Sequence, residues 1–109
     1  ITKIITEKPR PRSASTDNWA TSVNQTPRPN WGAGEVADQY RVLLDSAIAN
    51  GDVNYVIDHT SIREVGNYYK WIANGSNNYM TVDWDHTSQI GHELNAVDFR
   101  AAFNSFTYN

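Results

Sequence analysis

Residues 53–61, VNYVIDHTS, and residues 80–88, MTVDWDHTS, carry the same motif in a similar context. In both stretches apolar and polar residues alternate before the tetrapeptide Asp-His-Thr-Ser, and the second copy begins 27 positions after the first. Alternation with a period of two is typical of a β-strand, so each tetrapeptide is predicted to follow a strand directly. We call the two tetrapeptides the DHTS repeat.

Helical patterns surround the two predicted strands. Apolar residues recur every three or four positions over 35–50, and Asn50-Gly51 favours the end of a helix there. A second helix is predicted from Ser61 to residue 73, because Ser61 and Glu64 match a capping box. A third is predicted to start at an Asn95 cap. The apolar face of the first helix consists of Val36, Tyr40, Leu43, Leu44, Ala47 and Ile48.

The order of these elements predicts an α+β fold. A strand, a crossover helix and a second strand form a βαβ unit with parallel strands, so we expect a small single domain with a short sheet and three helices. An antiparallel arrangement that uses a strand within residues 1–8 stays open. Because two strands make a poor sheet, the N-terminal region or residues 105–108 should add another.

Composition divides the chain near residue 30. All four Pro lie between Pro9 and Pro29, so we expect residues 1–30 to form an extended Pro-rich arm or linker, and residues 31–109 a compact domain. Between Pro9 and Pro29 the few apolar anchors are Trp19 and Val23, so this stretch should contribute little to the core. The chain begins with Ile1 rather than Met, as expected of a processed product or of a domain of a longer protein.

Composition also excludes several kinds of site. The 109 residues include no Cys, which rules out disulfides, Cys-based zinc sites and thiolate nucleophiles. No apolar run is long enough for a membrane span. Residues 1–30 carry a net charge of +3 and the remainder −6, so the acidic body argues against tight duplex binding unless a carrier protein supplies affinity.

The DHTS repeat has the composition of an acid-base site. Two His rings with a pKa near 6.5 can serve as one base and one acid at neutral pH, and adjacent carboxylates can hold each ring in one tautomer. Such a set can cleave RNA through its own 2′-hydroxyl with no metal and no other cofactor. The predicted catalytic residues are His59, His86, Asp58 and Asp85, and those predicted to bind the phosphate are Thr60, Thr87 and Ser88.

Two other functions stay open. Asp58, Asp83, Asp85 and His86 could serve a divalent-metal-dependent nuclease or phosphoesterase. In a non-catalytic protein-binding module, by contrast, the Pro-rich arm would dock a partner and the DHTS repeat would only cap loops.

Two resemblances favour the nuclease. The pattern His-x-Ser at His59-Thr60-Ser61 and at residues 86–88 resembles the paired motifs of two-histidine phosphodiesterases. A Pro-rich arm before about 80 residues with Asp, His, Thr and Ser in short loops after strands is similar to the C-terminal nuclease domains of bacterial polymorphic or contact-dependent toxins. The toxin resemblance implies an RNA substrate, commonly tRNA, secretion and delivery into a target cell, and an immunity protein as partner.

Overall fold

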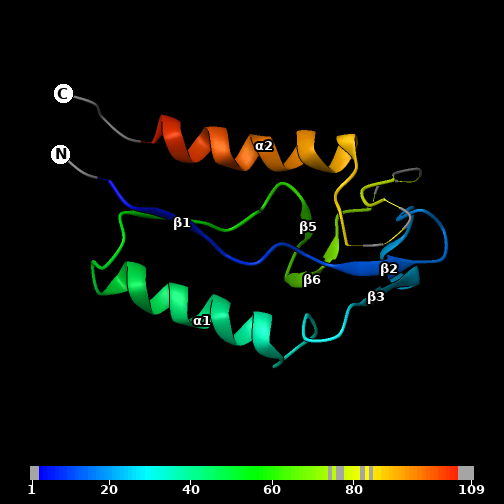
Figure 1. Ribbon diagram of the computed structural model, residues 1–109, viewed down its shortest axis with the longest axis horizontal. Helices are drawn as coiled ribbons and strands as arrows, with labels where there is room; N and C mark the ends of the chain where they lie inside the picture. The colour runs from blue at the N-terminus through cyan, green and yellow to red at the C-terminus, as the bar shows by residue number, and fades with distance from the viewer. Residues whose placement is uncertain (1–2, 74, 76–77, 82, 84, 106–109) are drawn as a thin grey trace.

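The computed structural model describes residues 3–73, 75, 78–81, 83 and 85–105. Within this part of the chain there are two α-helices, α1 (Val36–Ala49) and α2 (Gln89–Asn104), and three two-stranded sheets. The helices flank a parallel pair formed by β1 (Ile5–Glu7) and β4 (Tyr55–Ile57) (Figure 1). The expected α+β class is therefore confirmed, but the three helices and the βαβ unit are not matched as predicted. The parallel strands are β1 and β4, with α1 between them in the chain, rather than strands within residues 53–57 and 79–84.

The region predicted as the second helix is a β-hairpin instead. β5 (Arg63–Glu64) pairs with β6 (Asn67–Trp71) in antiparallel fashion, and Gly66 in the turn has a φ of +72°. Aromatic residues are enriched in strands, and Gly is the residue that most readily takes the positive φ of this turn. Both preferences favour a hairpin over the helix that the apolar spacing predicts. The capping box does not form, since Glu64 accepts a hydrogen bond from the backbone N–H of Ala73.

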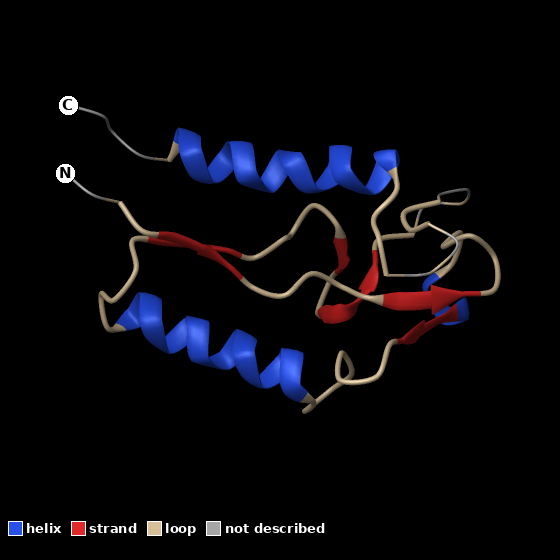
Figure 2. Cartoon of the chain, in the orientation of Figure 1, coloured by secondary structure: helices blue, strands red, loops and turns tan. Residues whose placement is uncertain are grey.

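The Pro-rich segment is folded rather than extended. It contains β2 (Ser13–Ser15), a short 3₁₀-helix (Ser22–Asn24) and β3 (Gln25–Pro27), and β2 and β3 pair in antiparallel fashion (Figure 2). Trp19 belongs to the main hydrophobic cluster and is 2% exposed. The expectation that this arm adds little to the core is therefore wrong, while the domain division near residue 30 stays a prediction.

The core cluster joins this segment to the β5–β6 hairpin. The rings of Trp71 and Tyr79 stack with centroids 5.0 Å apart, and the side-chain amide of Gln25 bonds both backbone groups of Trp71 at 2.8 Å. That amide satisfies buried backbone groups as a neighbouring strand would. The cluster consists of Trp19, Ile62, Trp71, Tyr79 and Met80.

Both helices differ in detail from their predictions. α1 spans nearly the predicted residues, but its buried positions are Ala37, Arg41 and Leu44, and Leu43 on the predicted apolar face is 64% exposed. α2 begins at Gln89, well before Asn95. A Cβ atom at Gly91 would lie 2.4 Å from the carbonyl oxygen of Tyr79, so Gly permits a close approach that its low helix propensity obscures in the sequence.

Of the strand predicted over residues 79–84, the described residues show one antiparallel bridge, between Met80 and Thr87. Val82 and Trp84, two members of its predicted apolar face, lie outside the described residues. The bridge closes a loop that carries the second copy of the DHTS repeat to the N-terminus of α2.

Candidate active site

The first histidine of the DHTS repeat is buried. The His59 side chain is 1% exposed, and its Nε2 lies 2.7 Å from Oε2 of Glu7. Its backbone has a φ of +52°, in the left-handed region that non-glycine residues rarely adopt. Burial lowers the pKa of His59 despite the opposing effect of Glu7, so the neutral ring is favoured. His59 is thus a buried partner of Glu7.

Asp58, the expected partner of His59, contacts cations instead. Its carboxylate lies 3.4 Å from Nζ of Lys8 and 3.3 Å from Nη2 of Arg63. The carboxylate beside His59 comes from β1, because the parallel register aligns Glu7 with Ile57 at the end of β4. Glu7, rather than the expected Asp58, is therefore the carboxylate in a position to orient the His59 ring.

The second histidine of the repeat is open to solvent. The His86 side chain is 80% exposed, and its Nδ1 lies 2.5 Å from Oδ2 of Asp83. Hydrogen bonding to Asp83 raises the pKa of His86, and donors led by the backbone N–H of Asp85 hold the pKa of Asp83 well below its usual range. The carboxylate that orients this ring is Asp83, three residues before it, rather than the expected Asp85.

Asp85 lies between two arginines. It accepts a hydrogen bond from Nη2 of Arg12, and its Oδ1 lies 3.6 Å from Nε of Arg28. Both arginines come from the segment predicted to be an arm. Asp85 is therefore part of an ion-pair network.

The three predicted phosphate-binding residues have separate positions. Thr60 donates to Oδ1 of Asp98 at 3.4 Å, on α2. Ser88 is the N-cap of α2, and its hydroxyl accepts from the backbone N–H of Gly91. Thr87 lines the pocket described next, together with His86 and Asp85.

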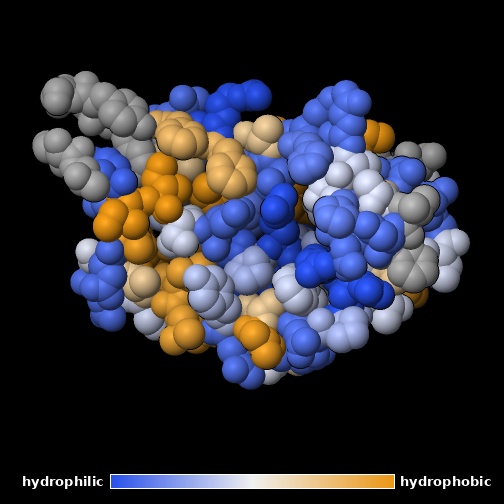
Figure 3. Space-filling view, viewed as in Figure 1, coloured by the Kyte–Doolittle hydropathy of each residue, from blue (hydrophilic) through white to orange (hydrophobic). Residues whose placement is uncertain are grey.

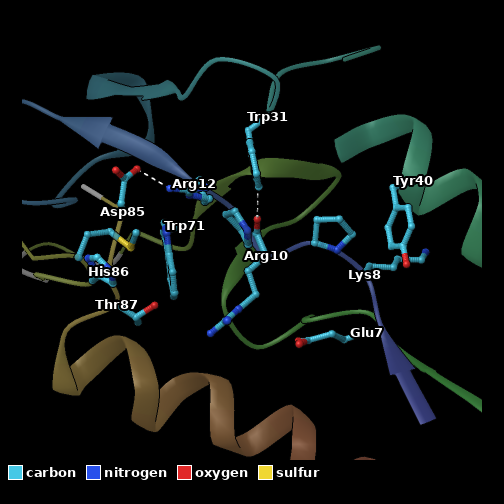
Figure 4. A pocket seen from close by; sticks show the side chains of 13 residues that line it. Glu7, Lys8, Arg10, Arg12, Trp31, Tyr40, Trp71, Asp85, His86 and Thr87 are labelled. Atoms are coloured by element: carbon cyan, nitrogen blue, oxygen red, sulfur yellow. Dashed lines mark hydrogen bonds and ion pairs between the residues drawn. The ribbon is translucent and has the colours of Figure 1, made fainter. Parts of the chain in front are cut away.

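A pocket of about 470 Å³ lies between the segment after β1 and the loop before α2 (Figure 4). We call it the arginine pocket. Its lining combines two carboxylates, three basic side chains, a histidine and aromatic rings. The residues that line it are Glu7, Lys8, Pro9, Arg10, Pro11, Arg12, Trp31, Tyr40, Trp71, Met80, Asp85, His86 and Thr87.

The arrangement of the pocket places His86 and Thr87 on one side and Glu7 on the other, with the Arg10 side chain between them in the view of Figure 4. His59 is not among the lining residues described and reaches the pocket only through its contact with Glu7. Whether His59 and His86 face each other across one cleft stays a prediction. Glu7 and His86, by contrast, both line the pocket.

Residues 7–12, which form one wall of the pocket, are not among the site residues predicted from the sequence. Their signal is the alternation Lys8-Pro9-Arg10-Pro11-Arg12, because a residue before Pro is held extended and an extended chain alternates its side chains. Buried Arg41 holds this wall through hydrogen bonds of 3.0 and 3.2 Å to the Pro9 carbonyl. Pro-rich composition alone predicts a linker here, because it does not reveal these tertiary contacts.

Trp31 also anchors the segment from Arg10 to Arg12. The indole N–H of Trp31 donates to the Arg10 carbonyl at 3.0 Å, and the Arg12 guanidinium lies 4.5 Å from the centroid of the indole ring. A guanidinium over an aromatic face is attracted by the ring quadrupole. These contacts give Arg10 and Arg12 a preorganised backbone and, for Arg12, a supported side chain.

Among the residues that the structure describes, no three His, Asp or Glu side chains group closely enough to hold a metal ion. The described portion of the chain likewise includes no helix with the length and apolar character needed to cross a membrane. Comparison with protein-family models, curated protein sequences and solved structures found no match.

Proposed function

We propose that this chain is a metal-independent endoribonuclease that works at the arginine pocket. The observation that supports this most directly is one cavity lined by an exposed histidine, a carboxylate and two arginines. These are an acid, a base and phosphate ligands, which is the set required to cleave RNA through its own 2′-hydroxyl. His86 has the role expected from the sequence, and Glu7 takes the second proton-transfer role in place of His59.

His86 is the proposed general acid. Its exposed Nε2 is available to a substrate while Asp83 holds Nδ1, and the raised pKa favours the protonated ring near neutral pH. When the P–O5′ bond breaks, the leaving oxygen takes the Nε2 proton. Asp83 is a positioning residue, because it orients the ring.

Glu7 is the proposed general base. Its side chain is 39% exposed, so it can contact a substrate while His59 holds Oε2 from behind. The carboxylate accepts the proton of the 2′-hydroxyl as that oxygen attacks phosphorus. The products are a 2′,3′-cyclic phosphate and a 5′-hydroxyl, and the two proton transfers together restore the enzyme once Glu7 and His86 re-equilibrate with water.

Arg10 is the proposed ligand of the phosphate that reacts. It projects into the pocket between the proposed acid and base, where a guanidinium can stabilise charge that develops on the nonbridging oxygens (Figure 4). Arg10 and Arg12, which both line the pocket, place positive charge there on a chain whose net charge is −3.

The resemblance to bacterial toxin domains makes tRNA the first substrate to test. It also suggests secretion, delivery into a target cell and an immunity protein that covers the arginine pocket.

Incubation of the pure protein with total RNA, with and without a chelator, tests the proposal. We expect cleavage that survives the chelator, with 2′,3′-cyclic phosphate and 5′-hydroxyl ends. His86→Gln should abolish it, whereas His92→Gln, a change on an exposed position of α2, should not. Loss of cleavage with the chelator would favour the metal-dependent alternative instead, and absence of any cleavage would contradict a nuclease function.

A protein-binding module is the second candidate, favoured by the exposed apolar residues of α1. Val36, Val42 and Leu43 are each more than half exposed. In the face shown in Figure 3, hydrophobic side chains gather at the end of the molecule that holds α1 and the β1–β4 pair. If RNA is not cleaved, self-association tested by sedimentation of the wild type and of Leu43→Glu is the next measurement.

A further inference from the structure

Arg12 and Arg28 lie directly opposite each other on paired backbone. The Arg28 backbone N–H donates to the Arg12 carbonyl at 2.9 Å, which continues the β2–β3 pairing by one residue on each side. Like charges directly opposite in an antiparallel pair are destabilising. An anion between the two guanidinium groups would therefore relieve their repulsion.

The Asp85 carboxylate is the anion at this position, but it does not satisfy both arginines. Its Oδ1 accepts from Nη2 of Arg12, but it lies 3.6 Å from Nε of Arg28, beyond hydrogen-bonding distance. The Nε atoms of Arg12 and Arg28 are buried and have no hydrogen-bond partner among the described residues. A phosphate has more acceptor oxygens than a carboxylate and matches guanidinium geometry well, so it would satisfy donors that Asp85 leaves unmet.

Of this arginine pair, Arg12 lines the arginine pocket, whereas Arg28 is next to it, 3.6 Å from Asp85. Arg12 and Asp85 line the pocket, and Trp31 supports the Arg12 guanidinium from one side (Figure 4). Arg10 lies two residues before Arg12 and also lines the pocket, and two residues of extended chain span about 6.6 Å. That step is comparable to the spacing of consecutive phosphates along an extended nucleic-acid strand.

We propose that Arg12 and Arg28 form a second phosphate subsite for a single RNA strand, and that the Asp85 carboxylate occupies it in the free protein. The inference rests on the proposed function, with the reacting phosphate on Arg10 and its neighbour in the strand on Arg12 and Arg28. Asp85 leaves the subsite when the strand binds. It therefore weakens binding and takes no part in proton transfer, contrary to the orienting role expected from the sequence.

Binding of a short single-stranded oligodeoxynucleotide tests the subsite, because this probe lacks the 2′-hydroxyl and is not cleaved. Asp85→Asn should tighten binding about fivefold, the scale of one close charge pair in water. Asp52→Asn is the matched control, since it removes the same charge from an exposed turn after α1. Affinity of Asp85→Asn no tighter than that of Asp52→Asn would overturn the proposal.

Arg28→Gln provides an independent variant with the opposite expected effect. It should weaken binding of the same probe and lower the slope of log affinity against log salt by about 0.7, the loss of one phosphate contact on a single strand. Arg100→Gln, at an exposed position of α2, should leave both unchanged apart from its general charge effect. An unaltered salt slope in Arg28→Gln would exclude the subsite.

The two proposals can fail separately. If the wild type cleaves no RNA but Asp85→Asn binds the probe more tightly than its control, the nuclease function falls and the phosphate subsite stands. If the wild type cleaves RNA and neither Asp85→Asn nor Arg28→Gln alters probe binding, the subsite falls and the nuclease function stands. Thermal unfolding of each variant shows that it is folded under the binding conditions.

Discussion

The Glu7 carboxylate lies 2.7 Å from Nε2 of His59 and also lines the arginine pocket. The two residues are 52 positions apart in sequence and meet because β1 and β4 are parallel neighbours. The Glu7 side chain therefore has a buried partner on one side and the arginine pocket on the other. This contact connects the first copy of the DHTS repeat to the pocket that contains the second.

Glu7→Gln tests the proposed base. The amide keeps the size of the side chain and can still bond His59, but it cannot accept the 2′ proton, so kcat should fall about 10²- to 10⁴-fold. Steady-state cleavage of a short RNA provides the measurement. Glu93→Gln, an equivalent change on exposed α2, is the control, and an equal loss in both variants would contradict the assignment.

Asp83→Asn should move the alkaline limb of the pH–rate profile. Asp83 raises the pKa of His86, so the protonated acid persists to higher pH in the wild type. Without that carboxylate the pKa of His86 falls, and activity should decline at a lower pH. A kcat profile between pH 5 and 9 measures the shift, and an unmoved alkaline limb would mean that His86 is not the acid.

Acidification should destabilise the fold through His59. The folded-state pKa of His59 lies below its ordinary 6.5, so the unfolded chain binds more protons as pH falls below that value. Stability present near pH 7 is then lost as pH falls from about 6.5 toward the folded pKa, by at most about 1.4 kcal/mol per pH unit. In urea unfolding, His59→Gln should reduce this dependence and His92→Gln should retain it. Equal slopes in all three proteins would refute the explanation.

Gly66→Ala distinguishes a hairpin from a helix by the sign of its effect. The φ of +72° at Gly66 disfavours any Cβ, so Ala should destabilise the fold by about 1–2 kcal/mol. In a helix the same change would stabilise by up to about 1 kcal/mol. Gly66→Asn should cost less than Ala, because Asn tolerates left-handed backbone. Chemical denaturation measures all three, and a stabilising Ala would restore the helical interpretation.

Trp19→Ala measures how much the Pro-rich segment contributes to the core. Trp19 is 2% exposed and its indole N–H donates to the Ser13 hydroxyl at 3.1 Å. Its removal should cost about 3–5 kcal/mol. Val23→Ala in the same segment should change stability by less than about 0.5 kcal/mol, since Val23 is 80% exposed. A small effect at Trp19 would show that the segment is peripheral after all.

Local sequence was sufficient for the elements whose signals are short-range. Helical periodicity and Asn50-Gly51 located α1 to within a residue or so, and alternation in residues 53–58 located β4. Ile5–Glu7 was predictable as a strand from its residue types. The DHTS repeat predicted His86 as a site residue, and His86 lines the arginine pocket.

Tertiary contacts decided the rest, because they depend on partners distant in sequence. In the hairpin at residues 61–73, Ile62 and Trp71 belong to the same buried cluster as Trp19. The spacing of apolar residues along this segment cannot reveal a contact with a residue so distant in sequence. The two identical tetrapeptides acquired different environments: His59 is buried against Glu7, whereas His86 is exposed beside Asp83. A side chain's protonation and access to substrate follow from burial and neighbouring charge, and both are set by the assembled fold rather than by the motif.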